Sequence, residues 1–231
     1  MSEISRSDDM GIGAHCMQLG CTFAAPQEAE AWRAASALRD AILASATTSK
    51  EASVCRVQLQ WWSEEITRLV NAEPRHPVSK GFASHGQITD HTAALMQDWL
   101  VLAERLIDNV AAESFTDTRV AAYRHHGVTM QIAAGAPIDA GADYRDASLA
   151  LSTLDEAIAS ADPAISNAVL ESFDQPAPSP QLPASHWIAA KLAVDLHQAN
   201  AQRRRIPGKL YLLIKAWRLA RQHQRLTESN Q

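Results

Sequence analysis

The sequence predicts an all-α fold, and three observations support this prediction. Long stretches rich in Ala, Leu and Arg carry apolar residues at helical spacing, Gly and Pro separate these stretches, and alternating strand patterns are absent. The 231 residues, 46% of them hydrophobic and 20% charged, are typical of a globular protein. Neither G-x-G-x-x-G nor G-x-x-x-x-G-K-[ST] occurs, which excludes Rossmann and P-loop sites. We expect seven or eight helices.

The first long helix is expected from Ala29 to Ala46, with an inward stripe of Trp32, Ala35, Leu38 and Ile42. The sequence Thr48-Ser49-Lys50-Glu51 has the form of a capping box, so a second helix is expected to begin there. Its inward side is predicted to hold Val54, Leu59, Trp62, Ile66 and Leu69, and its outward side Gln58, Glu65 and Arg68. Glu64 and Arg68 are spaced for an ion pair, and Asn71, Pro74 and Pro77 end the helix.

The remaining helices follow from the same spacing and from the breakers between them. They are expected at about Thr89 to Ala112, Asp117 to Ala134, Asp139 to Ser160, His186 to Arg205, and from Pro207-Gly208 to about Gln224. The first of these has Leu95, Trp99, Leu102, Leu106 and Val110 on its inward side. Residues 1–22 are interpreted as an N-terminal segment that can be flexible, and 23–231 as one domain. Four prolines make residues 174–183 a stiff extended connection.

Charge is distributed unevenly along the chain. Eight of the 21 Lys and Arg lie after residue 202, where Glu228 is the only acid, so this tail has a net charge of +7 and the rest −12. The basic residues that could meet an anionic surface or a diphosphate are Arg203, Arg204, Arg205, Lys209, Lys215 and Arg218.

The last helix is predicted to be amphipathic. Leu210, Leu213, Ile214, Trp217 and either Leu219 or Ala220 form its apolar side. This side either closes the bundle or lies on an anionic membrane. Nucleic acid is not expected as a partner, because the body is acidic and no recognition motif accompanies the tail.

The sequence predicts a cytoplasmic protein, with peripheral membrane contact through the last helix as an alternative. No apolar run approaches the roughly 20 residues that span a bilayer, and the first residues lack the apolar region of a signal peptide. The three cysteines, Cys16, Cys21 and Cys55, are expected to be reduced thiols without a metal.

The most distinctive stretch is Leu59-Gln60-Trp61-Trp62-Ser63-Glu64-Glu65-Ile66, which is followed by His76-Pro77-Val78. It resembles the "LQWW-x-(D/E)-E(L/I) … HPV" signature of the squalene/phytoene synthase family, particularly its short bacterial members. Phe23-Ala24-Ala25-Pro26, the segment from Leu106 to Tyr123, and the stretch from Leu210 to Arg221 resemble further parts of that family in the same order. The resemblance implies a single helical bundle of the isoprenoid synthase type and makes Gln60, Trp61, Trp62 and Tyr123 candidates for a substrate or partner groove.

Active members of this family join two prenyl diphosphates, and that chemistry needs facing carboxylates that hold Mg²⁺. The first acidic motif is expected between about Ala34 and Ser49, but Asp40 stands there alone, with Ala44 one turn later. Candidates for a second site are Asp139, Asp143 and Asp155. Acids at the start of a helix also occur simply to meet its dipole.

Three functions therefore follow as expectations. The leading one is a squalene/phytoene synthase-like protein that has lost condensation and serves as a binding or assembly protein, with no catalytic residue and no cofactor, and with an isoprenoid, a lipid or a protein as partner. The first alternative is an active Mg²⁺-dependent prenyltransferase. The second alternative is a membrane-surface protein anchored by the basic last helix.

Overall fold

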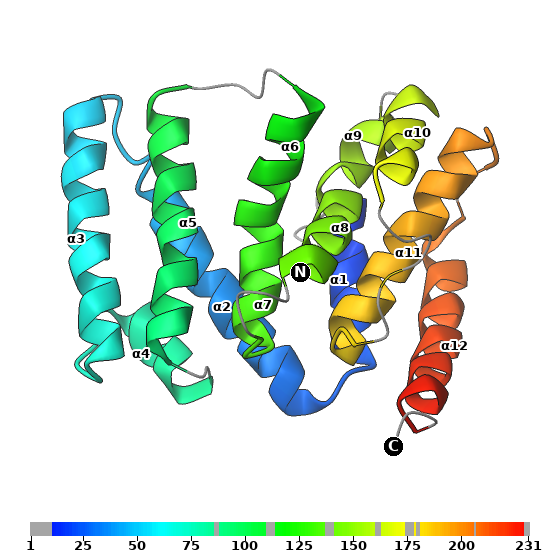
Figure 1. Ribbon diagram of the computed structural model, residues 1–231, viewed down its shortest axis with the longest axis horizontal. Helices are drawn as coiled ribbons and strands as arrows, with labels where there is room; N and C mark the ends of the chain where they lie inside the picture. The colour runs from blue at the N-terminus through cyan, green and yellow to red at the C-terminus, as the bar shows by residue number, and fades with distance from the viewer. Residues whose placement is uncertain are drawn as a thin grey trace, which may run out of the picture. The chain divides into compact units, whose positions relative to one another are not determined.

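The computed structural model describes residues 11–85, 88–109, 114–136, 141–159, 163–173, 178, 181–205 and 207–228. Every regular element within them is a helix, which confirms the predicted all-α class (Figure 1). Contacts divide the expected domain into two compact units. One is Pro26–Arg145, and the other joins Met1–Ala25 to Asp146–Gln231. The boundary falls inside helix α8 (Gly141–Ser152).

The unit Pro26–Arg145 is built around α2, which packs against α4, α5 and α7, while α3 packs against α5. Its elements are α2 (Pro26–Ala44), α3 (Ala52–Val70), α4 (Pro77–His85), α5 (Asp90–Ile107), α6 (Phe115–Ala122), a π-helical turn η1 (Tyr123–Gly127) and α7 (Val128–Ala133). Large side chains fill the core between these helices, among them Leu38, Ile42, Trp62, Phe82 and Trp99. Removing their apolar surface from water is what stabilises the unit.

The other unit is arranged around α11, against which α1, α9, α10 and α12 all pack. Its elements beyond α8 are α1 (Ile12–Thr22), α9 (Leu154–Ala159), α10 (Pro163–Glu171), α11 (Ala184–Ala201) and α12 (Lys209–Glu228). A helix surrounded on most sides must be apolar around its circumference, and α11 buries Ile188, Leu192, Val194 and Leu196 accordingly. Figure 1 shows α12, in red, beside the orange α11.

Three helices were not predicted. Within the N-terminal segment of residues 1–22, α1 is a helix whose residues Cys16, Met17 and Leu19 are buried. Helix α4 begins at Pro77, which was expected only to end the preceding helix, and α10 begins at Pro163. Proline is favoured at the first position of a helix because the amide hydrogen that it lacks has no partner there.

The prediction of a capping box at Thr48 to Glu51 is also wrong. The hydroxyl of Thr48 donates to the Ala44 carbonyl oxygen at 2.9 Å and so extends the end of α2. Helix α3 starts at Ala52, and Glu51, its N-cap residue, makes no side-chain capping hydrogen bond.

The predicted faces of α3 are correct except at two positions. Leu59, Trp62, Ile66 and Leu69 are buried and Arg68 pairs with Glu64 at 3.4 Å, as expected. Val54, however, is 40% exposed, and the side chain of Glu65, which was assigned to the outward side, is only 1% exposed. A carboxylate is buried in this way only where donors surround it.

Three of the later predicted helices differ from the structure in their bounds or in their regularity. The stretch from Thr89 to Ala112 is helical as α5, where Leu95, Trp99 and Leu102 are buried but Leu106 is exposed; Val110 lies outside the described residues. The stretch from Asp117 to Ala134 is divided into α6, η1 and α7, and Gly135 ends it with a φ of 61°. The stretch from Asp139 to Ser160 is divided into α8 and α9. Most of the proline-rich connection also lies outside the described residues.

Candidate functional site

Helix α12 has two apolar faces. Leu212, Ala216, Leu219 and His223 recur every three or four residues and are buried. The ring nitrogen Nε2 of His223 lies 3.0 Å from the Leu182 carbonyl oxygen. The terminal helix therefore closes its unit, which is one of the two alternatives that the sequence analysis gave for this helix. Of the residues assigned to the apolar side, Leu219 belongs to this buried face, whereas Leu212, Ala216 and His223 were not assigned to it.

The second apolar face of α12 is exposed to solvent. Leu210 is 71% exposed and Trp217 is 47% exposed. Leu213 and Ile214 lie between them along the chain and are 41% and 45% exposed. The spacing of these four residues brings them onto one stripe of the helix. These four side chains are most of those that the sequence assigned to the apolar side of the helix, and the contacts among the described residues of the unit leave them exposed.

Basic residues accompany this exposed stripe. The guanidinium of Arg221 lies 4.9 Å from the ring centroid of Trp217, a cation–π contact that places the charge on the apolar stripe itself. Arg218 follows Ile214 by four residues, and Arg225 follows Arg221 by four, so both lie along the same side of the helix. We call the set Leu210, Leu213, Ile214, Trp217, Arg218, Arg221 and Arg225 the α12 outer face.

A pocket of about 520 Å³ lies between α11 and α12. Its walls are formed by Leu192, Asp195, Leu196, Gln198, Ala199, Gln202, Arg204, Arg205, Pro207, Tyr211, Leu212 and Lys215. Three of the six predicted anion-binding residues, Arg204, Arg205 and Lys215, therefore meet in one cavity. The amides, Tyr211 and Asp195 were not predicted, because only the packing of α12 on α11 brings them together.

The one acid in the lining is held by two lysines. Asp195 Oδ1 accepts from Lys191 Nζ at 3.2 Å, and Asp195 Oδ2 lies 2.8 Å from Lys215 Nζ. In the part of the chain that the structure describes, Arg204 and Arg205 form no salt bridge. The two guanidinium groups thus remain uncompensated beside the cavity.

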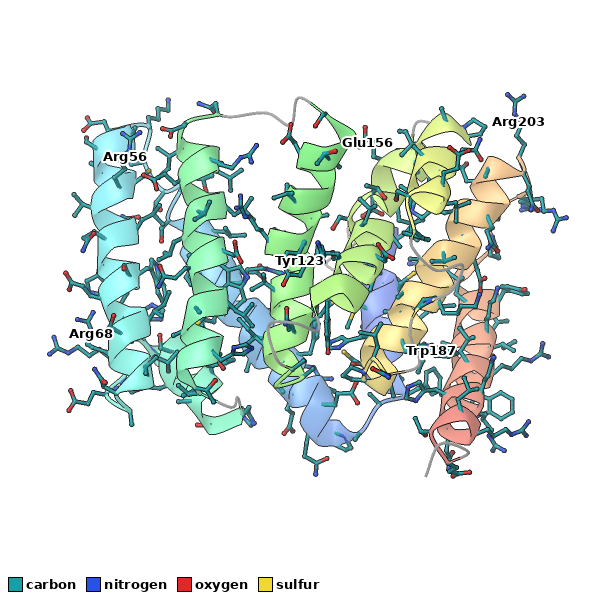
Figure 2. All side chains as sticks on the ribbon, viewed as in Figure 1. Arg56, Arg68, Tyr123, Glu156, Trp187 and Arg203 are labelled. Carbon is teal, nitrogen blue, oxygen red and sulfur yellow. The ribbon has the colours of Figure 1, made fainter. Side chains whose placement is uncertain are left out.

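The other predicted basic residues lie outside this cavity. Arg203 adopts a left-handed conformation with a φ of 53° after the end of α11, and Figure 2 shows its side chain extending away from the helix. Lys209 begins α12, and Arg218 belongs to the α12 outer face.

Of the three predicted metal ligands, the structure describes the side chain of Asp155. Asp139 and the side chain of Asp143 lie outside the described part of the chain. Asp155 caps α1: its Oδ1 accepts from the backbone nitrogens of Ile12 and, at 3.3 Å, Gly13. Asp40 is largely exposed and accepts from its neighbour Arg39 at 2.7 Å. Among the described residues, no group of three His, Cys, Asp or Glu is arranged to hold a metal ion.

The tryptophan pair is divided between the core and the surface. Trp62 is 5% exposed and its indole nitrogen donates to Ser45 Oγ at 2.7 Å, whereas Trp61 is 38% exposed and Gln60 faces solvent. The ring of His76 lies against both indoles, with centroid distances of 5.8 Å to Trp61 and 4.8 Å to Trp62. Within the stretch quoted for the family resemblance, Trp62 therefore has a packing role, whereas Gln60 and Trp61 lie at the surface.

Glu65 in this stretch is a buried acid whose carboxylate is surrounded by hydrogen-bond donors. Its Oε1 accepts from the backbone nitrogens of Arg75 at 2.7 Å and His76 at 2.8 Å, and its Oε2 accepts from Arg68 at 2.9 Å. Burial by itself would raise the pKa of Glu65, but these hydrogen bonds outweigh burial and lower the pKa below its usual value. Glu65 thus fixes the turn that leads into α4.

The last groove candidate, Tyr123, opens the π-helical turn η1. The side chain of Tyr123 is labelled in Figure 2, and its hydroxyl donates to Gln131 Oε1 at 2.7 Å. In the same turn, burial lowers the pKa of His125 to about 4, with a further contribution from the charge of Arg39, and the pKa of His126 is lowered as well. Both imidazoles are therefore neutral at pH 7.

Comparison with protein-family models, with curated proteins and with solved structures finds no match to this chain. Of the helices that the structure describes, none has both the length and the apolar character needed to span a bilayer.

Proposed function

We propose that this chain is a binding protein that docks on an anionic lipid surface through the α12 outer face. The observation that carries the proposal is that Leu210, Leu213, Ile214 and Trp217 are exposed although the other face of the same helix is already packed. A helix that only closed a bundle would have polar residues on its outward side.

Charge favours a lipid surface over other apolar partners. Arg218, Arg221 and Arg225 accompany the stripe, and each basic residue near an anionic membrane contributes about 1 kcal/mol of attraction. Apolar side chains that enter the boundary between headgroups and acyl chains add to this attraction, and Trp is well suited to that depth. The combination is typical of helices that lie in the plane of the membrane.

Co-sedimentation with vesicles tests the proposal. The chain should bind phosphatidylcholine vesicles that contain phosphatidylglycerol, and binding should weaken as salt is raised, because exposed charges are screened beyond about 10 Å at 0.1 M salt. Leu210→Glu should weaken binding about tenfold because a carboxylate would enter the interface.

The matched control is Val57→Glu. Val57 on α3 is also 71% exposed, but it lies outside the α12 outer face, so this variant should bind as the original chain does. Equal binding by all three proteins, or no binding at low salt, contradicts the proposal.

The family resemblance supplies a second candidate, a squalene/phytoene synthase-like protein that binds a lipid, an isoprenoid or a protein partner without condensing prenyl diphosphates. The observation in its favour is Asp40, whose exposed carboxylate pairs with Arg39 and has Ala44 in place of a second acid one turn later. Incubation with farnesyl or geranylgeranyl diphosphate and Mg²⁺ should release no pyrophosphate. Release of pyrophosphate that is lost in Asp143→Ala would instead support the active prenyltransferase.

A further inference from the structure

We propose that the pocket between α11 and α12 binds the phosphate group of an organic phosphate monoester. The cavity is distinct from the α12 outer face and belongs to neither function proposed above. Of the residues it shares with α12, Leu212 lies on the buried side of the helix, and Tyr211 and Lys215 lie beside that side.

The charge of the lining matches a dianion. Arg204, Arg205 and Lys215 contribute three positive charges, and Asp195 contributes one negative charge, which leaves a net charge of +2. A phosphate monoester carries about −1.5 to −2 at pH 7, whereas a carboxylate carries only −1. Arginine is also the side chain whose planar, forked donors best fit phosphate oxygens.

The negative charge of Asp195 does not repel such a ligand strongly, because two lysines pair with it. Its two carboxylate oxygens are engaged by Lys191 and Lys215, and its side chain is only 16% exposed. Arg204 and Arg205 therefore contribute positive charge to the lining that no salt bridge among the described residues neutralises. Because Lys215 spans from α12 to α11 through this contact, it also holds the two walls together.

Backbone hydrogen bonds fix the chain at Arg204. The nitrogens of Arg203 and Arg204 donate to the Asn200 and Ala199 carbonyl oxygens at 2.9 and 2.8 Å, which is the Schellman arrangement at the end of α11. The position of Arg204 thus follows from the helix, not from a long loop. A fixed site loses less entropy on binding than a mobile one.

The size and the remaining lining indicate that the phosphate is attached to an organic group. Pockets of 300–1,000 Å³ commonly hold small organic ligands, and this one has about 520 Å³. Leu192, Leu196 and Pro207 offer apolar contact, while Gln198 and Gln202 offer amides for hydroxyl groups. Inorganic phosphate alone would leave most of this surface unused.

Calorimetric titration of the full chain with glycerol 3-phosphate tests the proposal. We expect a Kd below about 1 mM. Glycerate, which has a carboxylate in place of the phosphate, should bind at least about tenfold more weakly because it pairs with fewer donors. Glycerol should not bind. Failure of glycerol 3-phosphate to bind, or equal binding of glycerate, overturns the proposal.

Paired charge variants locate the site. The double variant Arg204→Gln/Arg205→Gln should lose at least about tenfold in affinity for glycerol 3-phosphate, because each charged hydrogen bond is worth about 1.5–3 kcal/mol. Arg203→Gln/Arg218→Gln removes the same charge from the same tail outside the pocket and should retain the affinity. Equal loss in both would show a diffuse charge effect and contradict a pocket. Thermal melting of both variants is the control that shows whether they are folded.

Two further experiments distinguish a lipid headgroup from a free phosphate ester as the source of the phosphate. Leu210→Glu should still bind glycerol 3-phosphate, even where it no longer binds vesicles, because Leu210 does not line the pocket. With phosphatidic acid in the vesicles, a requirement for Arg204 and Arg205 would identify a lipid headgroup as the phosphate. Vesicle binding that is indifferent to them would identify a free phosphate ester.

Discussion

Glu65 shows at the scale of one residue how a buried charge fixes the local chain. Its carboxylate accepts from two consecutive backbone nitrogens and from Arg68, so the desolvation of the charge is offset by hydrogen bonds. The helical spacing placed Glu65 on the outward side of α3. It could not show that the chain would return from Arg75 and His76 to cover that side.

Replacing Glu65 with Gln should lower the free energy of unfolding by about 2 kcal/mol at pH 7, because hydrogen bonds to a charged group are lost. The pKa of Glu65 is lower in the folded chain than its ordinary value of 4.5. Its contribution is therefore complete above about pH 4.5 and is lost as the pH falls through the lowered pKa. The difference between the two proteins in urea unfolding should shrink in that acid range.

Glu64→Gln is the matched control for this prediction. Glu64 also pairs with Arg68, at 3.4 Å, but its side chain is 56% exposed. The same chemical change should cost less than about 0.5 kcal/mol there, because exposed ion pairs contribute little. Equal losses in the two variants would contradict the role assigned to Glu65.

At the scale of the elements, the end of helix α3 has a residue with an unfavourable backbone conformation. Ala72 follows α3 in a left-handed conformation, with a φ of 61°, and its nitrogen donates to the Leu69 carbonyl oxygen. Gly is usual at this position because a side chain costs about 1 kcal/mol or more there. Ala72→Gly should raise the free energy of unfolding by about 0.5–1 kcal/mol in denaturant titration. Asn71→Gly, one residue earlier at an ordinary φ of −78°, should bring no gain; a gain there would contradict the explanation.

The packing of α1 on α11 depends on Gly20. A Cβ at this position would lie 2.1 Å from the Ser185 carbonyl oxygen, so the two helices would have to separate. Gly20→Ala should lower the thermal midpoint, with a loss of about 1–3 kcal/mol. Gly81→Ala in α4 meets no atom within 4 Å and should be stabilising, since Ala has the higher helix propensity. If both variants are neutral, α1 does not approach α11 as described.

The sequence predicted the long helices well and the short ones poorly. Spacing of apolar residues identified α2, α3 and α5, each of which presents a long buried stripe, and it identified α12 by a stripe that is exposed. Helix α1 was missed because small residues, Gly13 and Gly20 among them, form its contact face and give little hydrophobic contrast. Asp155, a metal candidate from the sequence, caps this same helix, a contact between distant parts of the chain that no local pattern predicts.

At the scale of the molecule, the division of charge indicated the region in which we propose both binding sites. The basic tail forms α12 and the turn before it, and both the α12 outer face and the pocket belong to this region. Periodicity correctly placed Leu210, Leu213, Ile214 and Trp217 on one side. It could not tell which side of α12 its own unit would cover, because a helix with two apolar stripes gives the same pattern for either choice.

Quenching of tryptophan fluorescence by brominated phosphatidylcholine, in vesicles that also contain phosphatidylglycerol, tests the account most directly. Trp217, on the α12 outer face, should enter the lipid and be quenched, so Trp217→Phe should lose most of the quenching. Trp61→Phe, which removes a tryptophan of similar exposure from α3, should keep it. Quenching that persists in Trp217→Phe, or that disappears in Trp61→Phe, would contradict docking through α12.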